Sequence, residues 1–230
     1  GKGVAVGMKT RKRRRLSPEE RERQIVEGAI RFFAEVGFEG QTRELAKRLG
    51  ITQPLLYRYF PSKESLIERV YHEVYIKRWQ PHWESLIVDR RRPLQERLVT
   101  LYREYTQVIF NYEWVRIFMF AGLKGVNITE RYLAIVQDKL FVPVCTEMRE
   151  LAGLPSTAEV PLLPEELELA WDLHGGVYYL AIRKWIYNLP IPEDLSDHIE
   201  RVVHSFIAGT PPTLRRLFAE KPLRQQHSAS

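Results

Sequence analysis

Three residues at fixed spacing, Ala46, Gly50 and Leu56, strongly limit how this chain can fold. Ala46 is small, so another helix can cross close to it, and Gly50 allows the left-handed backbone of a tight turn. Leu56 is a branched apolar side chain that can fill the angle between two helices. A small residue, a glycine and a branched apolar residue at these offsets predict a helix-turn-helix.

The segment before this motif carries strong helix signals. Ser17 can cap a helix, Pro18 suits its first position, and Glu20 completes a capping box. A helix is therefore predicted over 18–36, with Gly37 as its left-handed stop.

The same signals delimit three further short helices. Thr42 is the predicted cap of a helix over 42–49, and Thr52 begins the next, whose first turn tolerates Pro54. Ser62 caps a fourth helix, which serves as a connecting helix over 62–80. Residues 16–63 are thus predicted to form a three-helix helix-turn-helix domain.

The rest of the chain reads as longer helices with no alternating strand pattern. The predicted helices cover 93–111, 113–123, 129–151, 165–188 and 193–208. Pro143 should kink the third of these, because proline has no N–H and clashes with the preceding turn. Residues 153–165 read as a Pro-rich connector, and the tail holds one short amphipathic piece, TLRRLFAE. The fold is therefore predicted to be all-α, with 83–230 as a second, larger domain.

Positive charge is concentrated at the N-terminal end. Residues 1–63 hold 15 Lys and Arg against 7 Asp and Glu, whereas the remaining residues hold 20 against 22. A basic end on a near-neutral body favours a module that binds a polyanion, and a merely solvated cationic segment is the alternative.

Residues 1–15 are predicted to be a flexible arm. Its six basic residues over 9–15 could enter a minor groove, lie along phosphates or stay solvated. Met8 is a candidate natural start, so residues 1–7 are not expected to belong to the fold.

Composition and motif spacing exclude several classes of protein. The 44% hydrophobic content is ample for a core, and no apolar run approaches the roughly 18 residues of a membrane span. Cys145 is alone, which rules out an internal disulfide and favours a reducing cytoplasm. The six histidines show no metal-ligand spacing, and no Ser elbow, P-loop or G-x-G-x-x-G is present. We therefore predict no catalytic site, no metal and no cofactor.

The helix after the turn has an unusual mixture of side chains at its N-terminal end. With Leu56 buried, polar and apolar residues share its outward face, namely Gln53, Pro54, Leu55, Tyr57 and Arg58. In a major groove, Gln can read adenine, Arg can read guanine, and Leu or Pro can contact a thymine methyl. Tyr57, Tyr59 and Lys63 can hold backbone phosphates, although Tyr59 fits the core equally well.

The segment 23–70 strongly resembles the DNA-binding domain of the TetR family of bacterial transcriptional regulators. The resemblance is carried by A-x-x-F-F-A-E-x-G-F, by T-R-E-L-A-x-R-L-G-I-T and above all by L-Y-R-Y-F-P-S-K-E-x-L. The resemblance implies groove contacts at Gln53, Pro54, Leu55, Arg58 and Tyr59, and backbone contacts at Tyr57 and Lys63. The full predicted DNA-binding set is Thr42, Arg43, Thr52, Gln53, Pro54, Leu55, Tyr57, Arg58, Tyr59 and Lys63.

The resemblance also implies a homodimeric repressor of a palindromic operator, whose larger domain binds a small inducer and dimerises. Candidate pocket residues are aromatic or polar and lie on the middle helices: Tyr102, Tyr105, Arg116, Phe120, Trp171, His174 and Tyr178. Simple core packing is the alternative for each of them. Candidate interface residues lie on the last two helices: Leu173, Gly176, Val177, Leu180, Ile199, Val202, Val203 and Phe206. An intramolecular helical hairpin is the alternative for these, and a DNA-binding dimer without any inducer is the alternative for the whole protein.

Overall fold

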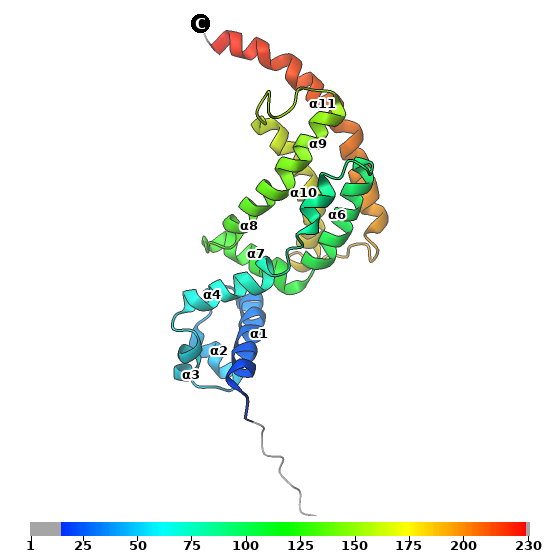
Figure 1. Cartoon of the computed structure of the whole chain (residues 1–230). Helices are drawn as coiled ribbons and strands as arrows, with labels where there is room; N and C mark the ends of the chain where they lie inside the picture. Colours follow the sequence, from blue (N-terminus) through cyan, green and yellow to red (C-terminus); the bar gives the residue numbers. More distant parts are fainter. Residues whose placement is uncertain (1–14, 229–230) are drawn as a thin grey trace, which may run out of the picture.

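The computed structural model describes residues 15–228, and every regular element in this range is a helix. The predicted basic arm lies outside the described residues except for Arg15. Helices α1–α4 gather at one end of the molecule and form a head, whereas α5–α11 form a larger body (Figure 1). The all-α prediction, with a helix-turn-helix at the N-terminal end, is confirmed.

The head consists of one long and three short helices in the predicted order. They are α1 (Pro18–Val36), α2 (Thr42–Leu49), α3 (Gln53–Tyr59) and α4 (Lys63–Tyr71). The Ser17 hydroxyl accepts from the backbone N–H of Glu20, and the Glu20 carboxylate accepts from that of Ser17, so the predicted capping box is confirmed. The prediction for Thr42 was wrong, because Gln41 is the N-cap of α2 and its side chain makes no capping bond.

The connecting helix ends earlier than predicted, and its last five residues form a π-helix. After α4, the π-helix η1 (His72–Ile76) follows, and the backbone N–H of Lys77 bonds the carbonyl of His72, five residues back. A π-helical turn is rare and is often found at functional sites. The two residues after Lys77 lie in no helix, so the connection between head and body is not one uniform rod.

The body is built from the remaining helices. They are α5 (His82–Ile87), α6 (Leu94–Ile109), α7 (Tyr112–Lys124), α8 (Thr129–Val136), η2 (Gln137–Phe141), α9 (Val142–Ala152), α10 (Pro164–Trp185) and α11 (Ser196–Ser228). Helix α11 packs against α6, α9 and α10, and its last turns extend past the other helices (Figure 1). Helix α7 packs along α1, so it joins the body to the head.

Three predictions about the body need correction. No helix was predicted over His82–Ile87, where α5 lies. The predicted kink at Pro143 takes the form of π-helix η2, in which the Val142 N–H bonds the Gln137 carbonyl. Helix α11 does not end near residue 208 but continues through Pro211 and Pro212, because the side chains of Thr210, Pro211 and Leu214 are buried against the body.

Candidate nucleic-acid interface and ligand site

The turn between α2 and α3 has the geometry that its spacing predicts. Gly50 adopts a left-handed conformation with φ 66° and ψ 31°, and the side chains of Ala46 and Leu56 are buried. Thr52 caps α3 by accepting from the backbone N–H of Leu55 at 3.2 Å. The sequence reasoning missed Gly28 in α1, where a Cβ would lie only 2.3 Å from a methyl carbon of Leu49. A glycine inside a long predicted helix was the sequence signal for this close contact.

Helix α3 turns Leu56 inward and presents several of its other side chains to the outside. Pro54, Tyr57 and Arg58 are exposed, and Gln53 and Leu55 are half-buried. Tyr59 is half-buried and packs against the hydrophobic core, which favours a role in core packing over a contact with DNA. The N-terminal end of α3 adds a partial positive charge to this face.

Cationic groups flank this face on both sides. Arg43, in the first turn of α2, and Arg58 are exposed and have no ion-pair partner within residues 15–228. The ammonium of Lys63 donates to the backbone carbonyl of Phe38, which ties the start of α4 to the loop between α1 and α2. An ammonium has three hydrogens, so Lys63 can keep this bond and still donate to a phosphate.

Thr42, Gln53 and Tyr57 form a hydrogen-bonded triangle at the centre of the face. The Thr42 and Tyr57 hydroxyl oxygens are 2.7 Å apart, and Gln53 Nε2 lies 3.2 Å from each of them. The triangle joins the first turn of α2 to α3. It brings together three of the predicted DNA-binding residues.

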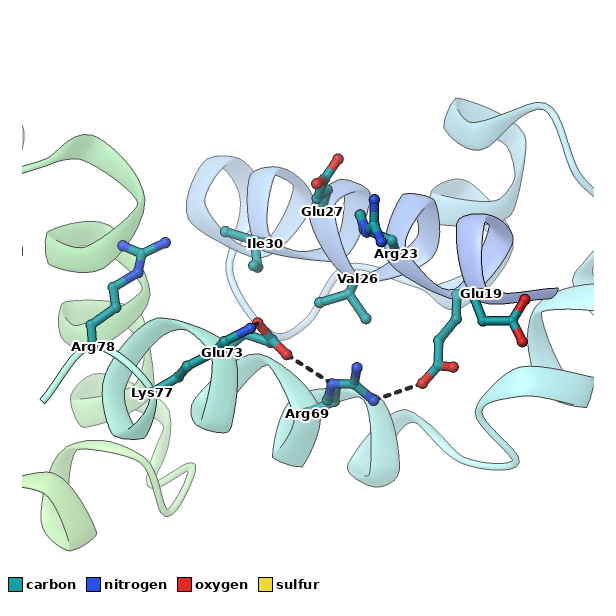
Figure 2. A pocket seen from close by; sticks show the side chains of 10 residues that line it. Glu19, Arg23, Val26, Glu27, Ile30, Arg69, Glu73, Lys77 and Arg78 are labelled. Carbon is teal, nitrogen blue, oxygen red and sulfur yellow. Dashed lines mark hydrogen bonds and ion pairs between the residues drawn. The ribbon is translucent and has the colours of Figure 1, made fainter. Parts of the chain in front are cut away.

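A charged groove lies between α1 and the connecting helix (Figure 2). It encloses about 510 Å³ and is lined by Glu19, Glu22, Arg23, Val26, Glu27, Ile30, Arg69, Glu73, Lys77 and Arg78. Arg69 bridges the two helices, with its guanidinium 2.7 Å from the Glu22 carboxylate and 3.2 Å from that of Glu73. These ion pairs are partly exposed, so they stabilise the junction only weakly and leave it adjustable.

Arg116 and Phe120, which we predicted to line a ligand pocket, lie instead at the contact between α7 and α1. The Arg116 guanidinium donates to the Ala34 carbonyl at 2.6 Å and to the carbonyls of Glu35 and Trp185 at 3.4 Å. The Phe120 ring lies 2.9 Å from the position that a Cβ on Gly37 would take. Arg116 therefore joins the C-terminal ends of α1 and α10, because the last carbonyls of a helix lack partners within it.

The other pocket candidates belong to one aromatic cluster in the body. Tyr102, Tyr105 and His174 are buried, and the Tyr102 hydroxyl lies 3.2 Å from His174 Nδ1. Burial lowers the pKa of His174 to about 4, so its ring is uncharged at neutral pH. Trp171 joins the cluster through Phe141, which lies 4.7 Å from its ring centroid and 5.1 Å from that of His174.

The cluster reaches the connecting helix through residues that the sequence reasoning did not single out. Tyr75, in η1, donates to the Trp114 carbonyl at 2.7 Å, and its ring packs against Trp114 and Tyr132. Tyr132 shares a short hydrogen bond with the hydroxyl of Tyr105. No pattern in the sequence distinguished these aromatic residues from ordinary core.

Several polar atoms in and beside this cluster are buried without a hydrogen-bond partner in the described chain. They include Trp79 Nε1, Trp83 Nε1 and the Tyr178 hydroxyl. A buried donor without an acceptor costs roughly 1–3 kcal/mol, so a bound molecule with acceptor atoms would be favoured here.

The predicted interface residues divide into two groups. Five are buried within the chain itself, namely Leu173, Val177, Leu180, Ile199 and Val203. Gly176 is exposed with open space beside it, and Val202 and Phe206 are half-buried. Gly175 and Tyr179, on the outer face of α10, are exposed as well. Most of the predicted interface residues thus belong to the core of their own chain.

No described helix is long and apolar enough to cross a membrane. Among the described side chains, no group of three or more His, Cys, Asp or Glu could hold a metal ion.

The short α2, the tight turn and the outward-facing α3 define a helix-turn-helix head carried on a larger helical body. Residues 25–70 match the model of the tetR family of bacterial regulatory proteins. The class A tetracycline repressor protein from transposon 1721 of Escherichia coli is 29% identical over 92 residues, which are 36% of this chain and 42% of that repressor. The N-terminal segment of the chain thus matches the tetR family model, as its motifs predict.

Solved structures show the same fold over most of the chain. A TetR-like transcriptional regulator from Rhodococcus sp. RHA1 has a TM-score of 0.61 at 18% identity and covers 85% of this chain and 100% of its own. A tetR-family regulator from Streptomyces coelicolor has a TM-score of 0.57 at 20% identity, with coverage of 89% and 90%. At these identities the likeness concerns the fold alone.

Proposed function

We propose that this protein is a homodimeric transcriptional regulator that binds a palindromic DNA operator and releases it in response to a small molecule. The observation that carries the proposal is the outward face of α3, where the exposed Pro54 and Arg58 lie beside the half-buried Gln53 at the positive end of the helix. Arg and Gln are the side chains that most often read guanine and adenine in the major groove.

Two features support a dimer. They are the small number of base pairs that one short helix can contact and the exposed surface of α10. One seven-residue helix contacts only a few base pairs, so two heads related by a twofold axis would read a palindrome. Gly175, Gly176 and Tyr179 form an exposed strip on α10 that another helix can approach closely. We place the interface there and on the half-buried Val202 and Phe206 of α11.

The response to a ligand is supported by the unpaired donors of the aromatic cluster. Trp79 and Trp83 flank the end of the connecting helix, and their indole nitrogens are buried without acceptors. A ligand that accepts from them would pull on the connecting helix, which carries the head. Tyr75 and the Arg116 contacts with α1 would transmit this displacement.

A regulator without an inducer is the second candidate. The close ring contacts in the cluster favour it, since the centroids of Trp83 and Tyr105 are 5.2 Å apart and those of Tyr105 and His174 are 5.4 Å apart. Rings at this spacing leave little room between them.

Selection of bound duplexes from a random DNA pool tests the main proposal. We expect a palindromic consensus, together with a dimeric mass in light scattering. A small-molecule screen by melting temperature then separates the two candidates, because stabilising compounds should also release the selected DNA. Selection of no consensus would contradict operator binding, and stabilising compounds that leave DNA bound would favour the second candidate.

A further inference from the structure

The triangle of Thr42, Gln53 and Tyr57 fixes the orientation of the one side-chain amide on the outer face of α3. Its three contacts join atoms of two helices, at 2.7 Å between the hydroxyl oxygens and 3.2 Å from each oxygen to the amide. Residues 53 and 57 are four apart, so they lie one above the other on the same side of α3.

Counting hydrogens decides which end of the amide faces the two hydroxyls. If Gln53 Oε1 faced them, the triangle would contain only two hydrogens, one from each hydroxyl, and one of its three contacts would stay unbonded. If Nε2 faces them, it supplies hydrogens of its own, and all three contacts can be hydrogen bonds. The arrangement with Nε2 inward is therefore the one that satisfies the triangle.

The shape of the triangle leaves part of the amide free. The two acceptor oxygens are closer to each other than either is to Nε2, so the angle between the two N···O directions is less than about 60°. The two N–H bonds of an amide point well apart, so a single hydrogen serves both oxygens in a three-centre bond. Oε1 and the second N–H make no hydrogen bond within the described chain.

We propose that Thr42 and Tyr57 are specificity-determining positioning residues, whose hydroxyls hold the Gln53 amide as a preset reader of adenine. The free acceptor and donor of the amide are the pair of groups that adenine N6 and N7 require. This inference rests on the proposed function, because it assigns roles within DNA reading. It differs from the expected role of Tyr57 as a holder of backbone phosphate, which would carry no sequence information.

The two roles predict different outcomes when a hydroxyl is removed. A lost phosphate contact weakens binding to every duplex alike. A lost positioning contact lets the amide rotate, so the preference for adenine falls at one base pair of each half-site and persists elsewhere. A correct base read by a bidentate pair is favoured by roughly 5- to 150-fold, which leaves ample range to detect the change.

The experiment uses the full chain and its selected operator. Affinities are measured at one salt concentration for duplexes that carry each of the four base pairs at each half-site position. Gln53→Ala identifies the position that residue 53 reads, as the one where the four affinities become equal. Tyr57→Phe and Thr42→Val are then compared with wild type at that position, and Thr42→Ser, which retains a hydroxyl, is the matched control.

We expect the wild-type chain to prefer adenine at this position, and Tyr57→Phe and Thr42→Val each to reduce that preference by about 5- to 10-fold. The double variant should reduce it further, and Thr42→Ser should keep it. An equal loss on all four duplexes in Tyr57→Phe and Thr42→Val would overturn the positioning role, and so would a wild-type chain that does not prefer adenine there. In both cases the proposed function stands, whereas a chain that selects no sequence from the pool removes that function itself.

Discussion

The head and the body place their polar side chains in opposite ways. On the head, Thr42, Gln53 and Tyr57 bond to each other at the surface and keep groups free for a partner outside. In the body, Arg149 and Glu166 are almost completely buried and bond each other at 2.7 Å. Polar contacts on the head thus leave groups available to a partner, whereas the ion pair in the body holds its own chain together. Burial makes the difference, because a pair shielded from water cannot exchange its partner for another without a large cost.

The largest effect is expected from breaking the buried pair. Arg149 also donates to the carbonyls of Pro155, Val160 and Pro161, so it holds the connector between α9 and α10. Replacing it with leucine would leave the Glu166 carboxylate buried without its partner. We expect Arg149→Leu to lower the free energy of unfolding of the body by about 3–5 kcal/mol. Tryptophan fluorescence during urea unfolding measures this, since all five tryptophans lie between residues 79 and 185.

Arg216→Leu is the matched control for that measurement. The Arg216 side chain is 83% exposed and pairs with Glu220 at 3.1 Å on the surface of α11. Exposed pairs at this spacing contribute only about 0.3–0.5 kcal/mol, so its unfolding curve should nearly coincide with the wild-type curve. Equal losses in the two variants would mean that burial does not distinguish the two kinds of ion pair.

A smaller effect is expected from pH, through the buried His174. Burial lowers its pKa in the folded chain to about 4, below the ordinary value of 6.5. Between these two values the unfolded chain binds the additional proton, so stability falls as pH decreases. Above about pH 7 the contribution is complete, and about 3 kcal/mol should be lost by pH 4. Urea unfolding at a series of pH values measures the slope.

His174→Phe should remove most of that slope and should be less stable than wild type at pH 7.5, because Tyr102 loses its hydrogen-bond partner. His204 lies exposed on α11, and His204→Gln is therefore the control that should leave the slope unchanged. A wild-type slope that survives in His174→Phe would assign the acid sensitivity to other groups.

The head could be predicted from sequence because its signals are local. Ser17, Gly50 and Thr52 act on residues within one or two turns, and each of them caps or ends a helix as expected. The Thr42 cap failed because Gln41 already takes the extended backbone that a cap requires. The residue that caps α2 therefore lies one position before Thr42, which has the better capping side chain.

The body resisted prediction because its decisive contacts join residues far apart in the chain. Arg116 looked like a ligand-binding arginine among apolar neighbours, but its partners are carbonyls of residues 34, 35 and 185. The last helix was predicted to end near residue 208, whereas burial of Leu214 continues α11 beyond Pro211 and Pro212. No local pattern contains this information, since tertiary packing overrides local propensity.

Arg58 and Lys63 separate the two kinds of DNA contact expected on the head. Arg58 is exposed without an ion-pair partner in the described chain, so its guanidinium is free to read a base. We expect Arg58→Ala to weaken operator binding by about 1–3 kcal/mol and to relax sequence preference. Lys63→Ala should weaken all duplexes alike, because its ammonium lies at a loop carbonyl beside the face. Unchanged operator affinity in Arg58→Ala at matched salt would refute the reading role of Arg58.

The smallest effect is expected at Thr52, and it tests whether the head depends on its local signals. Helix α3 has only seven residues, and the Thr52 hydroxyl accepts from the Leu55 N–H at its first turn. Losing a cap of this kind costs about 1 kcal/mol, so Thr52→Ala should speed hydrogen exchange of the α3 amides by roughly fivefold. Thr52→Ser retains the hydroxyl and should exchange like wild type. If Thr52→Ala exchanged no faster, packing of Leu56 alone would hold α3, and the head would then resemble the body in depending on its interior.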